Sequence, residues 1–421
     1  MSKSKKYRKY NAVIMRLVIM VAASLILGWL SILLFKGPLN LIQDADLDFC
    51  IRRYYNRFAH YDDKNVNVDR VPKVCDPNVA NIVIVEAGNK DNSQMAVIIS
   101  RLMKKDPAVI GLDISYRRDD KPIDSIDRML IDTIRKYKDR IVLAVHDDNG
   151  VSLRSFNKEL QSDGIKEGSV LMDSSYSRYN EEVVYQSGTI KKFSYQVVEE
   201  YRRCHSLVWE ESFQNAVTDL RPFCIDDTLH RMKYIECVEK EKIEGKIVLI
   251  TSTDVYYDRV TMPFSVVNPI QKCKGTTVGG GWVLACEIRS LMAHLRNQET
   301  NDSYRQHNVL VRMSQFSNFL LCLIVLCIHS ISVLLISRII PFFSKKIKRS
   351  SVKILVKIIA VVFEWILILL LQWFVIWCFL LIVDKFQLIP NVVVLMSSIL
   401  LNPISLKIAL LAFPVEYPDA S

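Results

Sequence analysis

The chain has 421 residues, of which 50% are hydrophobic and 24% are charged, and its formal net charge is +10. This composition is too apolar for an ordinary soluble protein, too charged for a transporter, and too rich in aliphatic and aromatic residues for a disordered chain. Outside residues 36–308 there are 16 Lys and Arg against 4 Asp and Glu, whereas the 36–308 segment holds 39 against 41. The basic charge therefore lies in the flanks, which argues against a nucleic-acid-binding domain, because such a domain needs a basic face of its own.

The flanks contain four apolar stretches of the length needed to cross a bilayer. The first follows a basic N-terminus, runs from Leu17 to Phe35 and carries no charge. A cleaved signal peptide is the alternative, but the apolar run is long and no A-x-A cleavage pattern follows it. The other three stretches are Ser314–Ser337, Ile358–Val383 and Val392–Phe413. We therefore predict a four-helix transmembrane region.

Positive charge gives the expected orientation of these spans. The N-terminal residues and the loop 339–357 are rich in Lys and Arg and contain no acid. The positive-inside rule places both in the cytoplasm, with residues 36–308 outside and the short tail 414–421 back inside. Residues 1–35 then form a cytoplasmic tail and the first helix, and 309–338, 358–383 and 392–413 form the other three.

Residues 36–308 have the pattern of one exported α/β domain, a parallel sheet covered by helices. Apolar strand runs alternate with helical stretches at Ser93–Lys105, Ile123–Lys138 and Trp282–Asn297. The strand runs are Asn81–Glu86, Ala108–Ile114, Arg140–His146 and Gly245–Ser252. Residues 150–192 depart from this alternation, so we expect one domain with an insertion. Residues 181–193 predict a hairpin with Gly188 at its turn, and a helix from Phe193 to about Arg203 follows.

In this order the segments resemble the CHASE domain of the second type. The matching segments include "LNLIQDADLDFCIRRYYNR", "NIVIVEAGNKD", "AVIGLDISY" and "EGKIVLITSTDVYYDRVTMPF", followed by "VGGGWVLACEIRSLMAHL" and three spans. The resemblance implies an extracellular sensor domain, of the kind found with bacterial cyclases and kinases. It therefore implies a bacterial inner membrane with the large domain in the periplasm. Glu86 stands where the family has Asp, and the family's WPWPR-like stretch after the first strand is absent.

No effector domain follows the last predicted span, so we expect the output in a separate chain. The function predicted is a sensor or regulatory membrane subunit that acts through a partner effector. A structural scaffold in a larger membrane assembly is the alternative. Membrane lipid is the other expected partner, and the sequence leaves homo- or hetero-oligomerisation open.

Candidate ligand-binding residues lie at or just beyond the carboxyl ends of the predicted strands, where open α/β sheets bind ligands. Convergent acids there could bind a cation or a polar ligand, and solvated loop acids are the alternative. The candidates are Glu86, Asp113, His146, Asp254 and Asp258. Thr276–Gly281, before a helix, is either a plain turn or an anion cradle, and it lacks the Lys and the preceding strand of a phosphate loop. No catalytic motif is present, so we expect no enzyme, no cofactor and no metal.

Cysteines and intramembrane charges complete the candidates. The exported segment holds seven cysteines, an odd number, and Cys286 in an apolar helix is the expected buried free thiol. We expect disulfides among the other six, namely Cys50, Cys75, Cys204, Cys224, Cys237 and Cys273. A zinc site made by some of these with His205 and His230 fits no standard spacing. His329, Glu364 and Lys407 lie at similar depth in three predicted spans and form the expected intramembrane polar cluster, with Lys407 at the headgroups and Glu364 protonated as the alternative.

Overall fold

The computed structural model of the chain describes residues 3–34, most of 81–209 and of 239–297, residues 311–345 and 404–412, and scattered other positions. The chain divides into two units. One comprises Met1–Cys50 and Arg312–Ser421, and the other comprises Ile51–Val311. The predicted exported domain, residues 36–308, covers nearly the same segment as the second unit.

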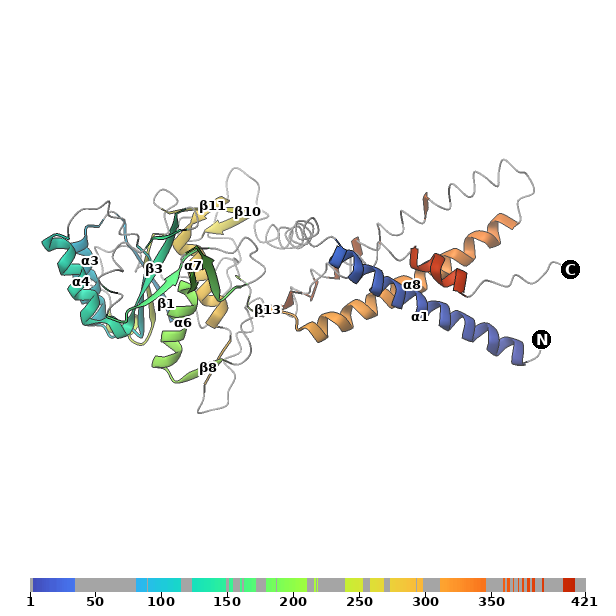
Figure 1. Ribbon diagram of the computed structural model, residues 1–421, viewed down its shortest axis with the longest axis horizontal. Coiled ribbons are helices and arrows are strands. Elements are labelled where there is room, and N and C mark those ends of the chain that lie inside the picture. Colours follow the sequence, from blue (N-terminus) through green and yellow to red (C-terminus); the bar gives the residue numbers. More distant parts are fainter. Residues whose placement is uncertain are drawn as a thin grey trace. The chain divides into compact units, whose positions relative to one another are not determined.

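The second unit is built on a mainly parallel sheet of six strands (Figure 1). Its parallel strands lie in the order β1, β9, β2, β3, β5, so that β9 enters the sheet between β1 and β2. Their bounds are β1 Ile82–Glu86, β2 Val109–Leu112, β3 Ile141–Asp148, β5 Lys166–Ser169 and β9 Ile247–Thr251. β4 (Val151–Leu153) runs antiparallel to the end of β3. The α/β class predicted from the sequence is confirmed.

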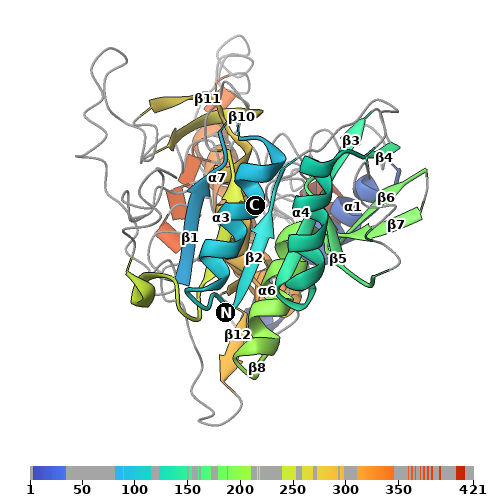
Figure 2. The same ribbon diagram turned by 90° about the vertical axis from the view of Figure 1, so that its left-hand side faces the viewer.

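Helices lie on both faces of this sheet (Figure 2). One face packs on α3 (Asn92–Met103) and α4 (Ser125–Lys136), and the apolar core between them includes Ile99, Leu130 and Ile250. The other face packs on α6 (Phe193–Cys204) and α7 (Gly280–Met292). Apolar residues on both faces of each strand are what this two-sided burial requires.

Local sequence explains where α3 and α4 begin. Asp91 caps α3 and Asp124 caps α4, and in each case the third helical residue, Gln94 or Asp127, bonds back to the cap. Such capping boxes satisfy backbone N–H groups that would otherwise lack a partner. Asp127 also accepts a hydrogen bond of 2.7 Å from Nδ2 of Asn92, which joins the two helices.

The predicted hairpin is confirmed as β6 (Glu182–Tyr185) and β7 (Gly188–Lys191). Gly188 has φ 127°, a conformation that favours glycine. The helix predicted to run to Asn297 ends at Met292, because Leu295–Asn297 forms β12 and pairs with β8 (Leu207–Trp209). Strand pairing outweighed helical periodicity there.

Smaller elements complete the unit. β10 (Arg259–Asn268) and β11 (Cys273–Gly279) form an antiparallel ribbon that leads directly into α7. The expectation that no strand precedes Thr276–Gly281 is therefore wrong. Two short 3-10 helices cover Lys138–Arg140 and Lys240–Lys242. Outside this unit, β14 (Leu388–Ile389) of the first unit pairs with β13 (Val311–Arg312), where the residue ranges of the two units meet.

The first unit contains α1 (Lys3–Leu34), α8 (Gln315–Lys345) and a helix over residues 404–412. Met20, Leu406 and Ala409 form a small buried cluster, and Ser24 bonds to Ser405 through their hydroxyls at 2.8 Å. In the part of the chain that is described, no helix is both long and apolar enough to cross a membrane. The four predicted spans therefore have no support from these helices, and they remain a prediction.

Candidate functional site

Four polar side chains lie in one row at the carboxyl edge of the parallel sheet. Register pairs Glu86 of β1 with Thr251 of β9, and Asp113 follows the end of β2 beside Thr251. His146 lies near the end of β3. Parallel neighbours in register point to the same face, so this row faces α6 and α7 rather than α3 and α4.

Asp113 is the buried centre of the row. Its Oδ2 accepts a hydrogen bond of 2.6 Å from Oγ1 of Thr251, and its Oδ1 lies 3.4 Å from Nε2 of His146. The second distance is at the long limit of a hydrogen bond. Burial raises the pKa of Asp113 to about 6, while the Thr251 hydrogen bond acts in the opposite direction. Burial also lowers the pKa of His146, although the charge of Asp258 opposes that shift.

Asp258 brings a second carboxylate to the row from the segment between β9 and β10. Burial, followed by the nearby charge of Asp113, raises its pKa to about 6, whereas His146 and the backbone N–H groups of Gly281 and Gly280 act to lower it. Asp258 therefore caps the start of α7, where the helix dipole favours a negative charge. The chain's own carboxylate thus lies at the helix start that the sequence offered as an anion cradle.

Two glycines allow α7 to approach this closely. A Cβ at Gly280 would lie 2.1 Å from Oδ2 of Asp258, and one at Gly281 would lie 2.4 Å from Oγ1 of Thr251. Both distances are far shorter than a van der Waals contact between a carbon and an oxygen atom, so neither position has room for a side chain. The start of α7 is therefore packed against the two residues that hold the site together.

A second buried polar group links α7 to α6. Nζ of Lys192, the residue before α6, lies 3.1 Å from Oε1 of Glu287 on α7, and Oγ of Ser194 donates to Oε2 at 2.7 Å. Tyr179 bonds to Ser194 at 2.9 Å, and its ring lies under the Lys192 ammonium. All four side chains are buried. Since buried carboxylates are stable only when paired and hydrogen-bonded, this group fixes α7 against the insertion.

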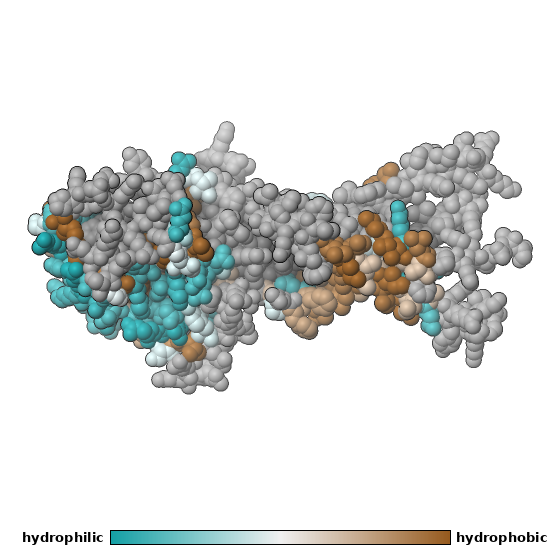
Figure 3. Space-filling view, in the orientation of Figure 1, coloured by the Kyte–Doolittle hydropathy of each residue, from teal (hydrophilic) through white to brown (hydrophobic). Residues whose placement is uncertain are grey.

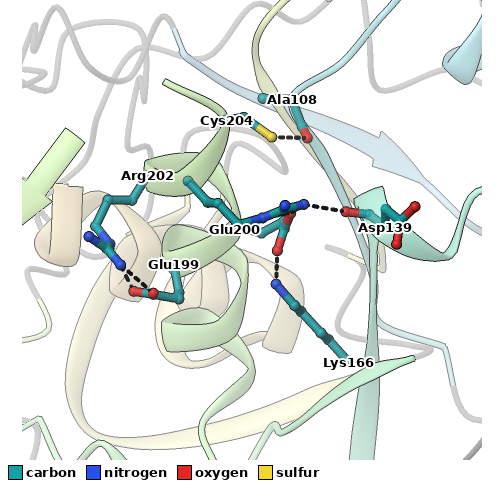
Figure 4. Close-up of polar contacts among 8 residues, drawn as sticks. Ala108, Asp139, Lys166, Glu199, Glu200, Arg202 and Cys204 are labelled. Atoms are coloured by element: carbon teal, nitrogen blue, oxygen red, sulfur yellow. Dashed lines mark hydrogen bonds and ion pairs between the residues drawn. The ribbon is translucent and has the colours of Figure 1, made fainter. Parts of the chain in front are cut away.

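Ion pairs fix the other end of α6 (Figure 4). Buried Glu200 pairs with Lys166 of β5 and with Arg203, and Arg202 pairs with Glu199. Sγ of Cys204 donates to the carbonyl oxygen of Ala108 at 3.4 Å. α6 is thereby attached to the sheet near the starts of its strands, away from the carboxyl edge.

Some of the ligand-binding residues predicted from the sequence lie together in the structure, and others do not. Asp113, His146 and Asp258 converge, and Glu86 lies on the same face two strands away. Asp254 lies outside the described residues. Among the residues that the structure describes, no group of three or more His, Cys, Asp or Glu could hold a metal ion.

The intramembrane cluster is not assembled by the described residues. His329 is buried in α8 and Lys407 is exposed on the helix 404–412, while Glu364 lies outside them. The predicted pairing of Glu364 with Lys407 therefore stays a prediction.

Cysteine assignments change at one position. Cys286 is buried and free, as expected, but Cys204 is an exposed free thiol, so its proposed part in a disulfide is wrong in this structure. Its Sγ faces a backbone carbonyl instead. The side chains of the other disulfide candidates lie outside the described residues: Cys50, Cys75, Cys224, Cys237 and Cys273.

Sequence reasoning missed Thr251 and the Lys192–Glu287 pair, and it interpreted Gly280 and Gly281 as part of a plain turn or an anion cradle, whereas they allow close packing of α7. Thr251 ends an apolar strand in the same way as Glu86 and Asp113, so its position at a strand end was a usable signal. Nothing in the sequence marks Lys192 and Glu287 as partners, because they lie 95 residues apart.

Comparison with known proteins agrees with this architecture. The model of the CHASE2 domain family matches residues 27–331. The chain belongs to the CHASE2 domain family. CHASE2 domains are extracellular sensor domains of signalling proteins, and a sensor role fits this chain. No curated protein and no solved structure was found to match it.

Proposed function

We propose that this CHASE2 protein is a sensor or regulatory subunit whose outer domain binds a small cationic ligand at the carboxyl edge of its sheet. The convergence of Asp113, His146 and Asp258 against the start of α7 is the observation that carries the proposal. Ligands of open α/β folds bind at this edge, where the loops diverge.

The charge at the edge indicates the class of ligand. Two carboxyl groups with raised pKa values lie close together, and no Lys or Arg among the described residues pairs with either of them. A nearby positive charge would relieve both the burial cost and the repulsion between them. An organic ammonium or guanidinium group supplies that charge together with several hydrogen-bond donors.

Calorimetric titration of the full-length chain at pH 7.5 tests the ligand class. Putrescine and arginine serve as cationic probes, and glucose and glutamate serve as neutral and anionic controls. We expect only the cationic probes to bind, and Asp258→Asn to weaken them about tenfold or more, as loss of one charge-assisted contact would. Asp132→Asn, at an exposed acid on α4, is the matched control. Equal binding by Asp258→Asn, or no binding of either cation, would contradict the ligand class.

We further propose that the first unit attaches the protein to the bacterial inner membrane, with the outer domain in the periplasm and both termini in the cytoplasm. Support comes from the large apolar side chains exposed along α1 and α8, including Ile14, Ile26, Phe316 and Leu335 (Figure 3). Extended apolar surface of this kind indicates contact with lipid or with another protein. Cysteines introduced at Lys5 and Lys346 should resist an impermeant thiol reagent in intact cells, and labelling of either would reject the orientation.

The output is proposed to lie in a partner effector, and the chain is assigned no reaction of its own. Ser194, which bonds to a carboxylate as a nucleophile would, is completely buried and closed to substrates. The scaffold alternative calls for a large apolar surface on the outer domain. Among the described residues of that unit, the large exposed apolar side chains are few: Val97, Ile126, Met129, Leu171 and Val184. If the extent of cross-linking between this chain and its partner protein is unchanged when a ligand is added, the scaffold alternative is favoured.

A further inference from the structure

The carboxyl-edge cluster and the start of α7 are in direct contact, so a change in one must affect the other. The backbone N–H of Gly280 donates to the backbone carbonyl oxygen of Asp258 at 3.2 Å, and that of Gly281 donates to the carbonyl oxygen of Ser252 at 3.1 Å, with the Asp258 carboxylate beside both groups. Thr251 packs against Gly281 while donating to Asp113. Asp113 in turn faces His146 through its other oxygen. One continuous chain of polar contacts therefore joins the imidazole to the helix start.

Four of the segments that meet at this point contribute an ionisable side chain. β1 contributes Glu86, the end of β2 Asp113, β3 His146 and the segment before β10 Asp258, while β9 contributes only the neutral Thr251. Arg259 follows Asp258 but is exposed, and residues 280–285 of α7 carry no ionisable group. Within the described part of the chain, no Lys or Arg therefore pairs with Asp113, His146 or Asp258.

We propose that this cluster is a proton switch on α7: Asp113 takes up one proton between its Oδ1 and Nε2 of His146, and this uptake fastens the first turn of the helix. The switch acts on the site of the proposed function and rests on that site being the sensing one. Loss of the proton loosens the same turn.

The geometry gives the reason. A protonated Oδ1 donates to the neutral imidazole, while Oδ2 still accepts from Thr251. Neutralising Asp113 removes the nearby charge that helps to raise the pKa of Asp258, so Asp258 keeps its own negative charge to lower pH, at the helix start where that charge is favourable. When Asp113 is ionised, its charge opposes that of Asp258 and weakens the cap. Because burial raises the pKa values of both acids to about 6 and lowers that of His146, the imidazole is a neutral acceptor in the range where the acids titrate.

The effect has a route out of the site. Glu287, two turns along α7, pairs with Lys192 at the start of α6, and the hairpin of β6 and β7 leads into that residue. A change in the packing of the first turn of α7 can therefore be transmitted to the hairpin of β6 and β7 through the buried Lys192–Glu287 ion pair.

Hydrogen–deuterium exchange of the full-length chain in detergent tests the switch. Protection of peptides within residues 273–292 is compared at pH 5.0 and pH 7.5, with labelling times scaled for the intrinsic pH dependence of exchange. We expect wild-type protection at pH 5.0 to exceed that at pH 7.5 by about tenfold, the factor that one pKa unit represents. Asp113→Asn, which mimics the protonated state, should show the same protection at both pH values, while Asp132→Asn should behave as wild type.

Thr251→Val provides a second variant if Asp113→Asn does not fold. It removes the hydrogen bond that lowers the pKa of Asp113, so the midpoint of the protection change should move to higher pH. Equal protection of the wild-type chain at both pH values would overturn the switch. So would a protection change whose midpoint pH is the same in the wild type and in Thr251→Val. If α7 protection depends on pH but the chain binds neither putrescine nor arginine, the ligand class is rejected and the proton switch is supported.

Discussion

Oγ1 of Thr251 donates a hydrogen bond of 2.6 Å to Oδ2 of Asp113, and the two residues are 138 positions apart in the chain. The bond exists because β9, a late strand, lies beside β2, an early one. It holds a buried carboxylate whose ionised form has no permanent cation beside it within the described structure. The hydrogen bond from Thr251 stabilises the ionised form and so limits the rise in the pKa of Asp113 that burial causes.

Thr251→Val should lower the free energy of unfolding at pH 7.5 by about 1.5–3 kcal/mol, the contribution of a hydrogen bond to a charged group. The loss should be smaller at pH 4.5, where Asp113 is protonated and needs less stabilisation. Urea denaturation at the two pH values measures both. An equal loss at both would mean that the methyl group, rather than the lost hydroxyl, causes the effect.

Asp113→Asn should raise stability at neutral pH. The folded pKa of about 6 lies above the ordinary value of 3.8, so the folded chain holds this proton more tightly than the unfolded one. Stability therefore falls as the pH rises between about 4 and 6, and stays lower above that window. A shift of about two units corresponds to about 3 kcal/mol, which Asn avoids while still accepting from Thr251.

Denaturation curves of Asp113→Asn at pH 4.5 and pH 7.5 check this prediction, with Asp132→Asn as the control at an exposed acid. Destabilisation of the Asn variant at pH 7.5 would show that the carboxylate has a partner that outweighs its burial. His146 contributes in the opposite sense, because its lowered pKa costs stability as the pH falls below its ordinary value.

Lys192→Met should destabilise the outer domain by about 3–5 kcal/mol, because it leaves the Glu287 carboxylate buried without its cation. Adding Glu287→Gln to that variant should recover a large part of the loss, since the unpaired charge is then removed. Glu244→Gln, in the exposed Lys240–Glu244 pair, should cost under about 1 kcal/mol. Thermal unfolding of the wild type, Lys192→Met, Glu287→Gln, their double variant and Glu244→Gln gives the comparison, and additive losses at Lys192 and Glu287 would show that the pair is not coupled.

Gly281→Ala should cost about 1–3 kcal/mol, because the new Cβ would lie 2.4 Å from Oγ1 of Thr251 and 2.6 Å from the carbonyl oxygen of Ser252. Gly164→Ala offers a contrast, because it has open space around the new methyl group and only the backbone cost of φ 70°. The two variants should also differ at the site, with only Gly281→Ala changing α7 protection. Equal protection in both would show that α7 is not packed against Thr251.

Native alkylation should modify Cys204 without a reductant and leave Cys286 unmodified until the chain unfolds, because the first thiol is exposed and the second is buried. Peptide mass mapping of iodoacetamide-treated protein measures both sites. Recovery of Cys204 in a disulfide-linked peptide would contradict the free thiol.

Much of the outer domain follows from the sequence alone. Strand runs that are apolar throughout, separated by amphipathic helices, determined the parallel sheet with helices on both faces, because each strand must bury two sides. The hairpin turn at Gly188 and the position of acids at strand ends could also be predicted, because turn residues and strand ends are local properties of the sequence. Asp113, His146 and Asp258 were therefore identified as candidates residue by residue.

The tertiary structure alone decided which of these residues meet. Strand order is not encoded in any local pattern, and the insertion of β9 between β1 and β2 is what puts Thr251 against Asp113. The end of α7 at Met292 and the Lys192–Glu287 pair likewise depend on partners far away in sequence. Periodicity and composition determine which side chains are buried or lie at an edge, whereas the distances between them come from long-range pairing, which each segment by itself leaves open.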